Sequence, residues 1–546
     1  MTGFACENWG FDATTGDVVY HMEDICVNVP GDGNGAYSAT YTSDPPEYYN
    51  GMLVYVMGGY TSMGGRAFMA AYNASAVIAA GAKGFDAACA SQSSETYTVG
   101  QVEGSCTPQV PGQGPMWQVF LQPPSTGSAN WDSQLCGNGV NGYVFDYPAF
   151  KSQGTMAIAC QNIPSSVTSL GGGDWGFPKA VTSGVSTSWG QYAIDNQTGM
   201  MYFGTGEAGP FEYYNQAVRP GLDLYSSSEM AVNLNTGKVA WWFQMVPHGL
   251  SDWDNSWATI LGKTNGTASV FKSTKDGILF SMNAATGAPN WVFANPAIAW
   301  APGLTPGDPT NATQMAYGWP NAPNSSWIQS PALAGSLESD LAYDGNTIFG
   351  AWFNSSPNVE SVNPQTQYAN TLRTLPWPDN VTVTAVNANT GKPEWSHFFN
   401  GFVFRGGMTV SNGMLIMPGG DGNIYFLNAQ NGDTIYSLHI GAPLFVDPTL
   451  GQNANGQEVM LQIIGGGRWL AVGQVGGGLT VPGALVAFTL GAAGTSSTGP
   501  ATTSTTAIAV ASNLPLNYIS YGAVAFAIII TVANVIISNR SRNKGR

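Results

Sequence analysis

The sequence predicts an all-β fold, and two observations support this class. The 546 residues include 70 glycines and 33 prolines, while 12% of the residues are aromatic and 9% are charged. This composition lacks the Ala, Glu, Lys and Leu bias of helical proteins and is typical of many short strands joined by turns. The second observation is a short pattern that recurs along the chain, so we expect one hairpin unit to be used repeatedly.

The repeated pattern is roughly A-x-[DN]-x-x-[TN]-G-x-x-x-[WY]. Each copy predicts a strand ending in Asn or Asp, a turn in which glycine accepts a positive φ, and a returning strand ending in Trp or Tyr. Repeated hairpins that each bury an aromatic side chain against the next unit indicate the blade contacts of a β-propeller. We expect the long inserts between copies, such as 292–340, to be loops on one face. The five copies are GFDATTGDVVY (10–20), AVNLNTGKVAW (231–241), SMNAATGAPNW (281–291), AVNANTGKPEW (385–395) and FLNAQNGDTIY (426–436).

The C-terminal region predicts a membrane anchor. Residues 518–537 carry no charge, and a helix that rises about 1.5 Å per residue spans a ~30 Å hydrocarbon layer over this length. Arginines and a lysine follow, which places the tail on the cytoplasmic side and the preceding chain outside the cell. We therefore expect a propeller domain (1–490), a Ser/Thr-rich stalk (491–515), a transmembrane helix (516–538) and a basic tail (539–546).

Charge and cysteine content restrict the function further. A net charge of −16 and few basic residues exclude nucleic acid as a partner. The six cysteines lie in the first third without C-x-x-C spacing, which favours disulfides, with 15 pairings open. Asn-x-Ser/Thr sequons predict glycosylation of an exported domain. Since no signal peptide is visible after Met1, we expect either export through the C-terminal helix or a start further upstream.

The repeats and the segment 188–257 resemble the quinoprotein alcohol and methanol dehydrogenases. This segment runs from SWGQYAIDNQTGMMYFGTGE to FQMVPHGLSDWDNSW, and the resemblance extends over about 10–490. It implies a propeller of seven to eight blades that holds pyrroloquinoline quinone (PQQ) and a Ca or lanthanide ion. The first repeat, 10–20, corresponds to a family segment that normally has more than one blade before it in the chain. Two interpretations stay open, a truncated gene model or about seven blades.

The resemblance also implies the site residues. After His248, Asp252 corresponds to the family's catalytic base, and Asp254 corresponds to the aspartate that binds the metal in lanthanide-type enzymes. Glu207, in FGTGE, stands where the family has a metal-binding asparagine in GTGN. Trp189 falls at the tryptophan beneath the planar quinone, which an indole face can stack on. The three carboxylates suit a hard cation, which takes six or more oxygen ligands.

Two positions depart from the family pattern. Ser62, four residues before Arg66, stands where the family has a metal-binding glutamate, so one carboxylate is lost. Ser336 stands near the position at which the family has a basic residue that hydrogen-bonds the quinone. Glu207, Asp252 and Asp254 restore three carboxylates, which is the number typical of a lanthanide site.

Two functions remain open at this stage. The first is a membrane-anchored extracellular quinoprotein dehydrogenase, in which Asp252 takes the hydroxyl proton of a small alcohol while hydride passes to PQQ and the metal polarises the quinone carbonyl. Electrons would then pass to a separate acceptor, because no C-x-x-C-H haem motif occurs. The second is a catalytically inactive, glycosylated cell-surface propeller that acts as a binding or coat protein. Ser62 and the short N-terminal region favour the second.

Overall fold

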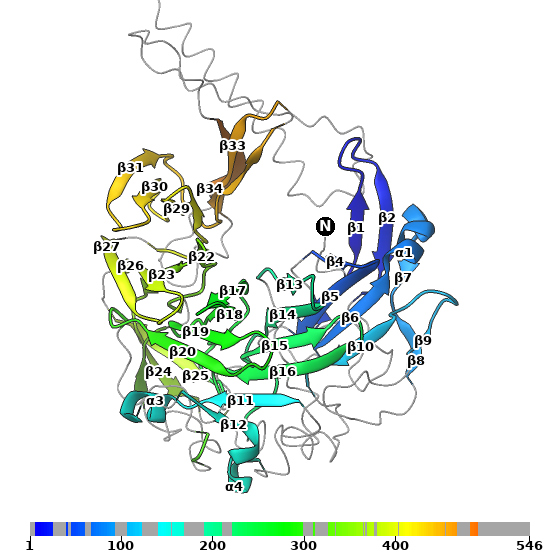
Figure 1. Ribbon diagram of the computed structural model, residues 1–546, viewed down its shortest axis with the longest axis horizontal. Helices are drawn as coiled ribbons and strands as arrows, with labels where there is room; N and C mark the ends of the chain where they lie inside the picture. Colours follow the sequence, from blue (N-terminus) through cyan, green and yellow to red (C-terminus); the bar gives the residue numbers. More distant parts are fainter. Residues whose placement is uncertain are drawn as a thin grey trace, which may run out of the picture. The chain divides into compact units, whose positions relative to one another are not determined.

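The structure is a computed structural model with two compact units, residues 1–401 and 402–546, each of which is described by itself. Regular structure is almost entirely β, which confirms the predicted class (Figure 1). The helices are short: α1 (Ala74–Ala80), α3 (Tyr147–Gln153) and α4 (Ser165–Thr168). The described residues are 6–25, 40–41, 45–59, 67–92, 106–122, 140–153, 156–168, 190–209, 221–298, 309–311, 326–332, 335–363, 365, 369–375, 379–401, 403–453, 455–466 and 481–489.

All five repeats form the predicted hairpins. In the second copy, the Asn233 carbonyl accepts a hydrogen bond from Gly237 N, and the Asn233 side chain accepts one from Asn235 N. The turn glycine has a positive φ in every copy, at Gly16, Gly237, Gly287, Gly391 and Gly432. The strands are β1 (Asn8–Phe11) and β2 (Val18–Glu23), β15 (Ser228–Asn233) and β16 (Lys238–Gln244), β19 (Ile278–Asn283) and β20 (Pro289–Ala294), β26 (Asn380–Asn387) and β27 (Pro393–Asn400), and β30 (Asn423–Asn428) and β31 (Thr434–His439).

The first unit is built from mainly antiparallel sheets. One is β17 (Ile260–Thr264), β18 (Thr267–Ser273), β19 and β20. A second is β13 (Ala193–Asp195), β14 (Met200–Gly204), β15 and β16, extended by β11 (Asn141–Phe145) and β12 (Ala157–Ala159). A third is β22 (Ala342–Tyr343), β23 (Thr347–Asn354), β26 and β27. A fourth holds β10 (Trp117–Phe120), β6 (Phe68–Asn73), β5 (Met52–Gly59) and β3 (Thr40–Tyr41), with β4 (Glu47–Tyr49) paired to β5.

The repeat tryptophans join successive sheets of the first unit. Trp241 on β16 is fully buried and donates its indole N–H to the Ala284 carbonyl in the β19–β20 turn, at 2.8 Å. Trp291 on β20 donates in the same way to Ala388 in the β26–β27 turn, at 2.9 Å. Gly287 lies directly against the Trp241 ring, where a Cβ atom would come within 2.6 Å. These sheets of the first unit therefore pack in the manner of propeller blades, as the repeats predict.

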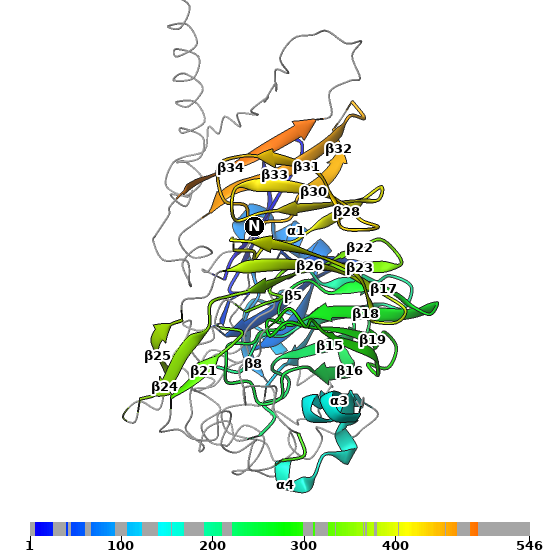
Figure 2. The same ribbon diagram turned by 90° about the vertical axis from the view of Figure 1, so that its left-hand side faces the viewer.

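The insert between the third and fourth repeats contains more regular structure than the sequence predicts. Part of 292–340 forms β21 (Ser326–Gln329), which pairs with β24 (Asn358–Val362), and β24 pairs with β25 (Ala369–Thr374) (Figure 2). The prediction of loop structure was wrong here because the pairing strand lies outside the insert. Trp327 packs against Leu250, and the Gln329 amide donates to the Ser251 carbonyl at 3.0 Å. The small sheet thus contacts the segment just before Asp252.

The second unit contains two further sheets. The first is β28 (Thr409–Ser411), β29 (Met414–Pro418), β30 and β31, and the second is β32 (Thr449–Gln452), β33 (Glu458–Gly466) and β34 (Val481–Thr489). Ile416, Ile424 and Leu444 form its buried core. In the first unit, β7 (Phe85–Asp86) pairs with β2, and β8 (Cys89–Gln92) pairs with β9 (Cys106–Pro108).

Several sequence predictions fall partly or wholly outside the described residues. No helix in the described ranges is long and apolar enough to cross a bilayer, and the predicted transmembrane segment, 516–538, lies beyond those ranges, as does the stalk. Within those ranges no cysteine has a free thiol, since Cys6, Cys89 and Cys160 are disulfide-bonded. The complete disulfide pairing stays open.

Candidate functional site

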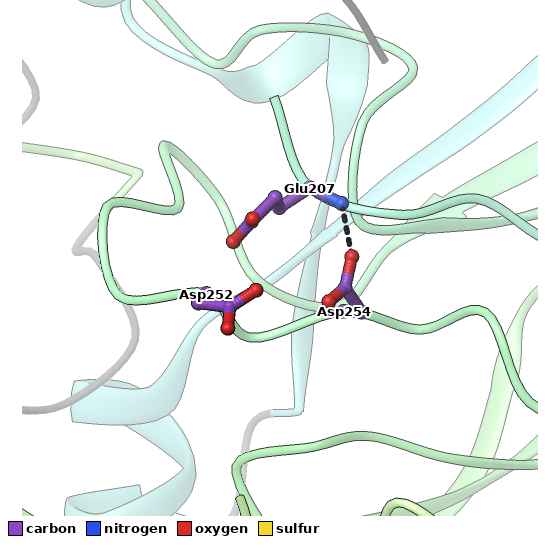
Figure 3. Close-up of side chains that lie close together, drawn as sticks. All are labelled: Glu207, Asp252 and Asp254. Carbon is purple, nitrogen blue, oxygen red and sulfur yellow. Dashed lines mark hydrogen bonds between the residues drawn. The ribbon is translucent and has the colours of Figure 1, made fainter. Parts of the chain in front are cut away.

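Three carboxylates meet at one end of the β13–β16 sheet (Figure 3). Glu207 follows β14, while Asp252 and Asp254 lie between β16 and β17. These two connections lie at the same end of the sheet because the strands between them are antiparallel. One oxygen from each carboxylate lies within 4.8 Å of the other two. Two oxygens bound to one calcium-sized ion are at most about 5 Å apart, so this group could hold a single ion.

Because the three carboxylates are buried, holding them in the charged form without a cation is energetically unfavourable. Glu207 is fully buried, and the side chains of Asp254 and Asp252 are 2% and 12% exposed. Within the described part of the chain, neither carboxylate oxygen of Glu207 has a hydrogen-bond partner. An unpaired buried carboxylate is strongly unfavourable, and a hard cation with oxygen ligands removes that cost. The donor set therefore fits Ca²⁺ or a lanthanide ion.

The pKa values of the group shift in the direction that burial dictates. Burial, followed by the charges of Asp252 and Asp254, raises the pKa of Glu207 well above its usual range. Burial also raises the pKa of Asp254 to about 7, although the nearby Lys275 ammonium acts in the opposite direction. Deprotonation of these carboxyl groups is thus less favourable in the folded protein, as expected for carboxylates held close together.

The loop geometry fixes the two aspartates relative to Glu207. His248 and Asp252 have φ values of 50° and 56°, so the backbone is left-handed at both residues. The Asp254 carboxylate accepts a hydrogen bond from Glu207 N at 2.9 Å (Figure 3). Trp253, between the two aspartates, is fully buried and anchors the loop in the protein interior.

Two charged residues of the site were not predicted from the sequence. Lys275, in the turn between β18 and β19, places its ammonium 2.9 Å from Asp252 and 3.5 Å from Asp254. Glu338, in the segment before β22, lies 3.9 Å from the same ammonium. The run STKDG around Lys275 is typical of an exposed turn. Its place shortly before the strand of the third repeat puts this turn at the end of a blade, but no local feature marks the lysine as buried.

The other predicted positions have mixed outcomes. Ser336 is buried, and its N–H donates to the Lys275 carbonyl at 2.6 Å. Lys275, from another turn, thus lies beside Ser336, while the correspondence of Ser336 to the family's basic residue stays a prediction. Trp189, Ser62 and Arg66 lie outside the described residues.

Another buried carboxylate beside the site, Asp276, gives a stability prediction. Asp276 accepts hydrogen bonds from the Thr274 hydroxyl and from Ile278 N, and burial raises its pKa to about 7. The unfolded chain loses this proton near pH 4, but the folded chain keeps it to about pH 7. Stability from this group is therefore fully present below about pH 4 and is lost as the pH rises from about 4 to about 7.

Asp276→Asn keeps the acceptor oxygen and removes the titration. We expect the variant to match the wild type near pH 4 and to be more stable at pH 8, by on the order of 2–4 kcal/mol. Chemical denaturation in EDTA at several pH values measures the difference. Asp12→Asn is the control, because two backbone N–H groups lower the pKa of that exposed carboxyl, and its effect should have the opposite sign. Parallel pH curves for wild type and Asp276→Asn would contradict the prediction.

Comparison with known proteins agrees with the predicted resemblance and with the fold. The family described as "Glucose/ethanol/alcohol dehydrogenase, beta-propeller domain" matches residues 168–342, and one described as "Outer membrane protein assembly factor BamB" matches 327–481. Quinoprotein alcohol dehydrogenase PedH of Pseudomonas putida is 27% identical over 49% of this chain and 47% of its own length. Methanol dehydrogenase [cytochrome c] subunit 1 of Methylorubrum extorquens is 23% identical over 56% of this chain and 51% of its own.

Solved structures support the same fold. A europium-containing methanol dehydrogenase superposes with a TM-score of 0.54 at 15% identity, covering 86% of this chain and 72% of that chain. The chain spans about half the length of the curated relatives that it matches. The site-bearing segment lies inside the matched region 168–342. We conclude that this chain carries a propeller-like domain related to the β-propellers of the PQQ-dependent alcohol and methanol dehydrogenases.

Proposed function

We propose that the protein is a PQQ-dependent oxidoreductase that oxidises a small alcohol and holds a Ca or lanthanide ion through Glu207, Asp252 and Asp254. One observation carries the proposal: three buried carboxylates offer oxygens within 4.8 Å of one another, and the Glu207 oxygens have no hydrogen-bond partner among the described residues. That arrangement suits a bound cation and is poorly explained in a scaffold without one.

The same geometry supports separate roles for the three carboxylates. Asp252 is the most exposed of them, so it is the one that a substrate hydroxyl can reach, and it would accept the hydroxyl proton. In the structure, Lys275 donates a 2.9 Å hydrogen bond to Asp252. Glu207 and Asp254 are deeper and would serve as metal ligands. When bound, PQQ supplies the acceptor for the two electrons that leave the alcohol carbon, and the metal ion polarises its carbonyl.

The experiment is reconstitution of the purified chain with PQQ and either Ca²⁺ or La³⁺. We expect PQQ to be retained after gel filtration only when an ion is supplied, and alcohol-dependent reduction of a dye to follow. Three carboxylates should favour the trivalent ion. A protein that retains neither ion nor PQQ would instead support the non-catalytic surface propeller.

We also propose that electrons leave to a separate protein and that the domain is extracellular and anchored by 516–538. The acceptor is suggested by relatives whose names include cytochrome c, such as the methanol dehydrogenase subunit. The anchor rests on the uncharged segment 518–537 and the basic residues after it.

Protease treatment of intact cells tests this topology. We expect release of a soluble fragment that ends within the stalk, 491–515, because Ser/Thr-rich segments are readily cleaved when exposed. An epitope tag placed after residue 546 should stay protected until the cells are permeabilised. Loss of the tag from intact cells, or full retention of the chain while other surface proteins are cut, would contradict the topology.

A further inference from the structure

Among the described residues, the Lys275 ammonium lies close to more carboxyl groups than it can neutralise. Its ammonium forms ion pairs with Asp252, Asp254 and Glu338 at 2.9, 3.5 and 3.9 Å. Glu207 adds another carboxylate against Asp252 and Asp254. Lys275 and Glu338 are both almost fully buried, with side chains 4% and 2% exposed, so solvent screens these charges weakly.

Lys275 therefore occupies the position of a counter-ion for two of the three proposed metal ligands. A divalent or trivalent cation held by Asp252 and Asp254 would repel an ammonium at such short range. Glu338 belongs to the ion pairs of Lys275 but not to the group of three carboxylates. Glu338 can thus keep the ammonium paired when Asp252 and Asp254 bind a metal ion.

The backbone around these residues holds such an arrangement in place. Lys275 N donates to the Asp254 carbonyl at 3.0 Å, and Ser336 N donates to the Lys275 carbonyl at 2.6 Å. The main chain at 275 is therefore fixed between the Asp254 loop and the segment that carries Glu338. The flexible lysine side chain can move its ammonium between the two sides while the backbone stays still.

Resting on the proposed function, we infer that Glu338 is a positioning residue, which receives the Lys275 ammonium when a metal ion binds to Glu207, Asp252 and Asp254. The lysine then alternates between two sets of partners, the metal ligands without an ion and Glu338 with one. Removing the Glu338 charge would leave the ammonium on Asp252 and Asp254, where it competes with the ion.

Ion binding by four proteins tests this inference. Dissociation constants for Tb³⁺ are measured by its sensitised luminescence in the wild type, Glu338→Gln, Lys275→Met and the double variant. We expect Glu338→Gln to weaken binding by roughly tenfold, which is the effect of about 1.4 kcal/mol. We also expect Lys275→Met to tighten binding more in the Glu338→Gln background than in the wild type. Glu360→Gln, a buried carboxylate on β24, is the matched control and should bind as the wild type does.

Three results would count against the role inferred for Glu338 or against the metal site. Equal or smaller tightening by Lys275→Met in the Glu338→Gln background overturns the inference, because the two residues then act independently on the ion. A crystal structure with La³⁺ gives a second test, in which the ammonium should lie closer to Glu338 than to Asp252. An ammonium still bonded to Asp252 beside the ion also overturns the inference. A wild type that binds no Tb³⁺ refutes the proposed metal site itself, which separates that failure from failure of the Glu338 role.

Discussion

Asp252→Asn is expected to lower kcat for alcohol oxidation by about 10²–10⁴-fold in the reconstituted protein, the usual contribution of a general base. The amide cannot accept the hydroxyl proton, but its oxygen can still face a metal ion. Retention of PQQ and of the ion should therefore fall much less than the rate does. Stopped-flow dye reduction measures the rate, and gel filtration with metal analysis measures retention.

Two further variants distinguish the loss of a catalytic base from the loss of a metal ligand. Glu207→Gln should reduce ion retention as well as the rate, because the buried carboxylate is proposed as a ligand rather than a base. Asp379→Asn is the control, since this partly buried carboxyl has a raised pKa but bonds Ser356 and is not one of the three clustered carboxylates. An Asp252→Asn protein that keeps more than a tenth of the wild-type rate would rule out Asp252 as the base.

Trp241→Ala should lower the free energy of unfolding by roughly 3–5 kcal/mol, as for other large buried aromatics. The indole is fully buried, lies 5.9 Å from the Tyr202 ring and donates to the Ala284 carbonyl of the next sheet. Its removal leaves a cavity between two sheets and an unpaired carbonyl. Trp241→Phe should lose less, because it keeps the ring and gives up the hydrogen bond.

Two glycines give a matched test of the same contact. Gly287 and Gly266 have φ values of 73° and 80°, so alanine is strained by a similar amount at each. A Cβ at Gly287 would meet the Trp241 ring, whereas a Cβ at Gly266 would meet nothing within 4 Å. Gly287→Ala should therefore be less stable than Gly266→Ala by about 1–3 kcal/mol in urea denaturation. Equal losses would mean that the ring contact contributes little.

The sequence predicts local structure well where one segment holds all the needed information. The repeat 231–241 carries its turn asparagine, its positive-φ glycine and its docking tryptophan within eleven residues, and it forms the expected hairpin. β21 was missed because Ser326–Gln329 pairs with 358–361, and neither strand has a turn signal that links the two.

The candidate site could likewise be predicted only in part from the sequence. The resemblance points to Glu207, Asp252 and Asp254, and the structure brings them together, while their roles stay predictions. Lys275 and Glu338 were missed because their burial arises where separate turns pack together. A lysine in STKDG has no local feature that distinguishes a buried ammonium from a solvated one. The charge balance of the site is therefore a property of the packing between sheets.

The hydrogen bonds between the site loops have a consequence for folding. Glu207 N bonds Asp254, Lys275 N bonds the Asp254 carbonyl, and Ser336 N bonds the Lys275 carbonyl, so the network runs from residue 207 to residue 336. Contacts between segments so far apart in the chain form slowly, because long loops must close first. The metal-binding arrangement should thus complete late, after the sheets have docked. A bound ion would then slow unfolding far more than it accelerates folding, and would act mainly on the lifetime of the native state.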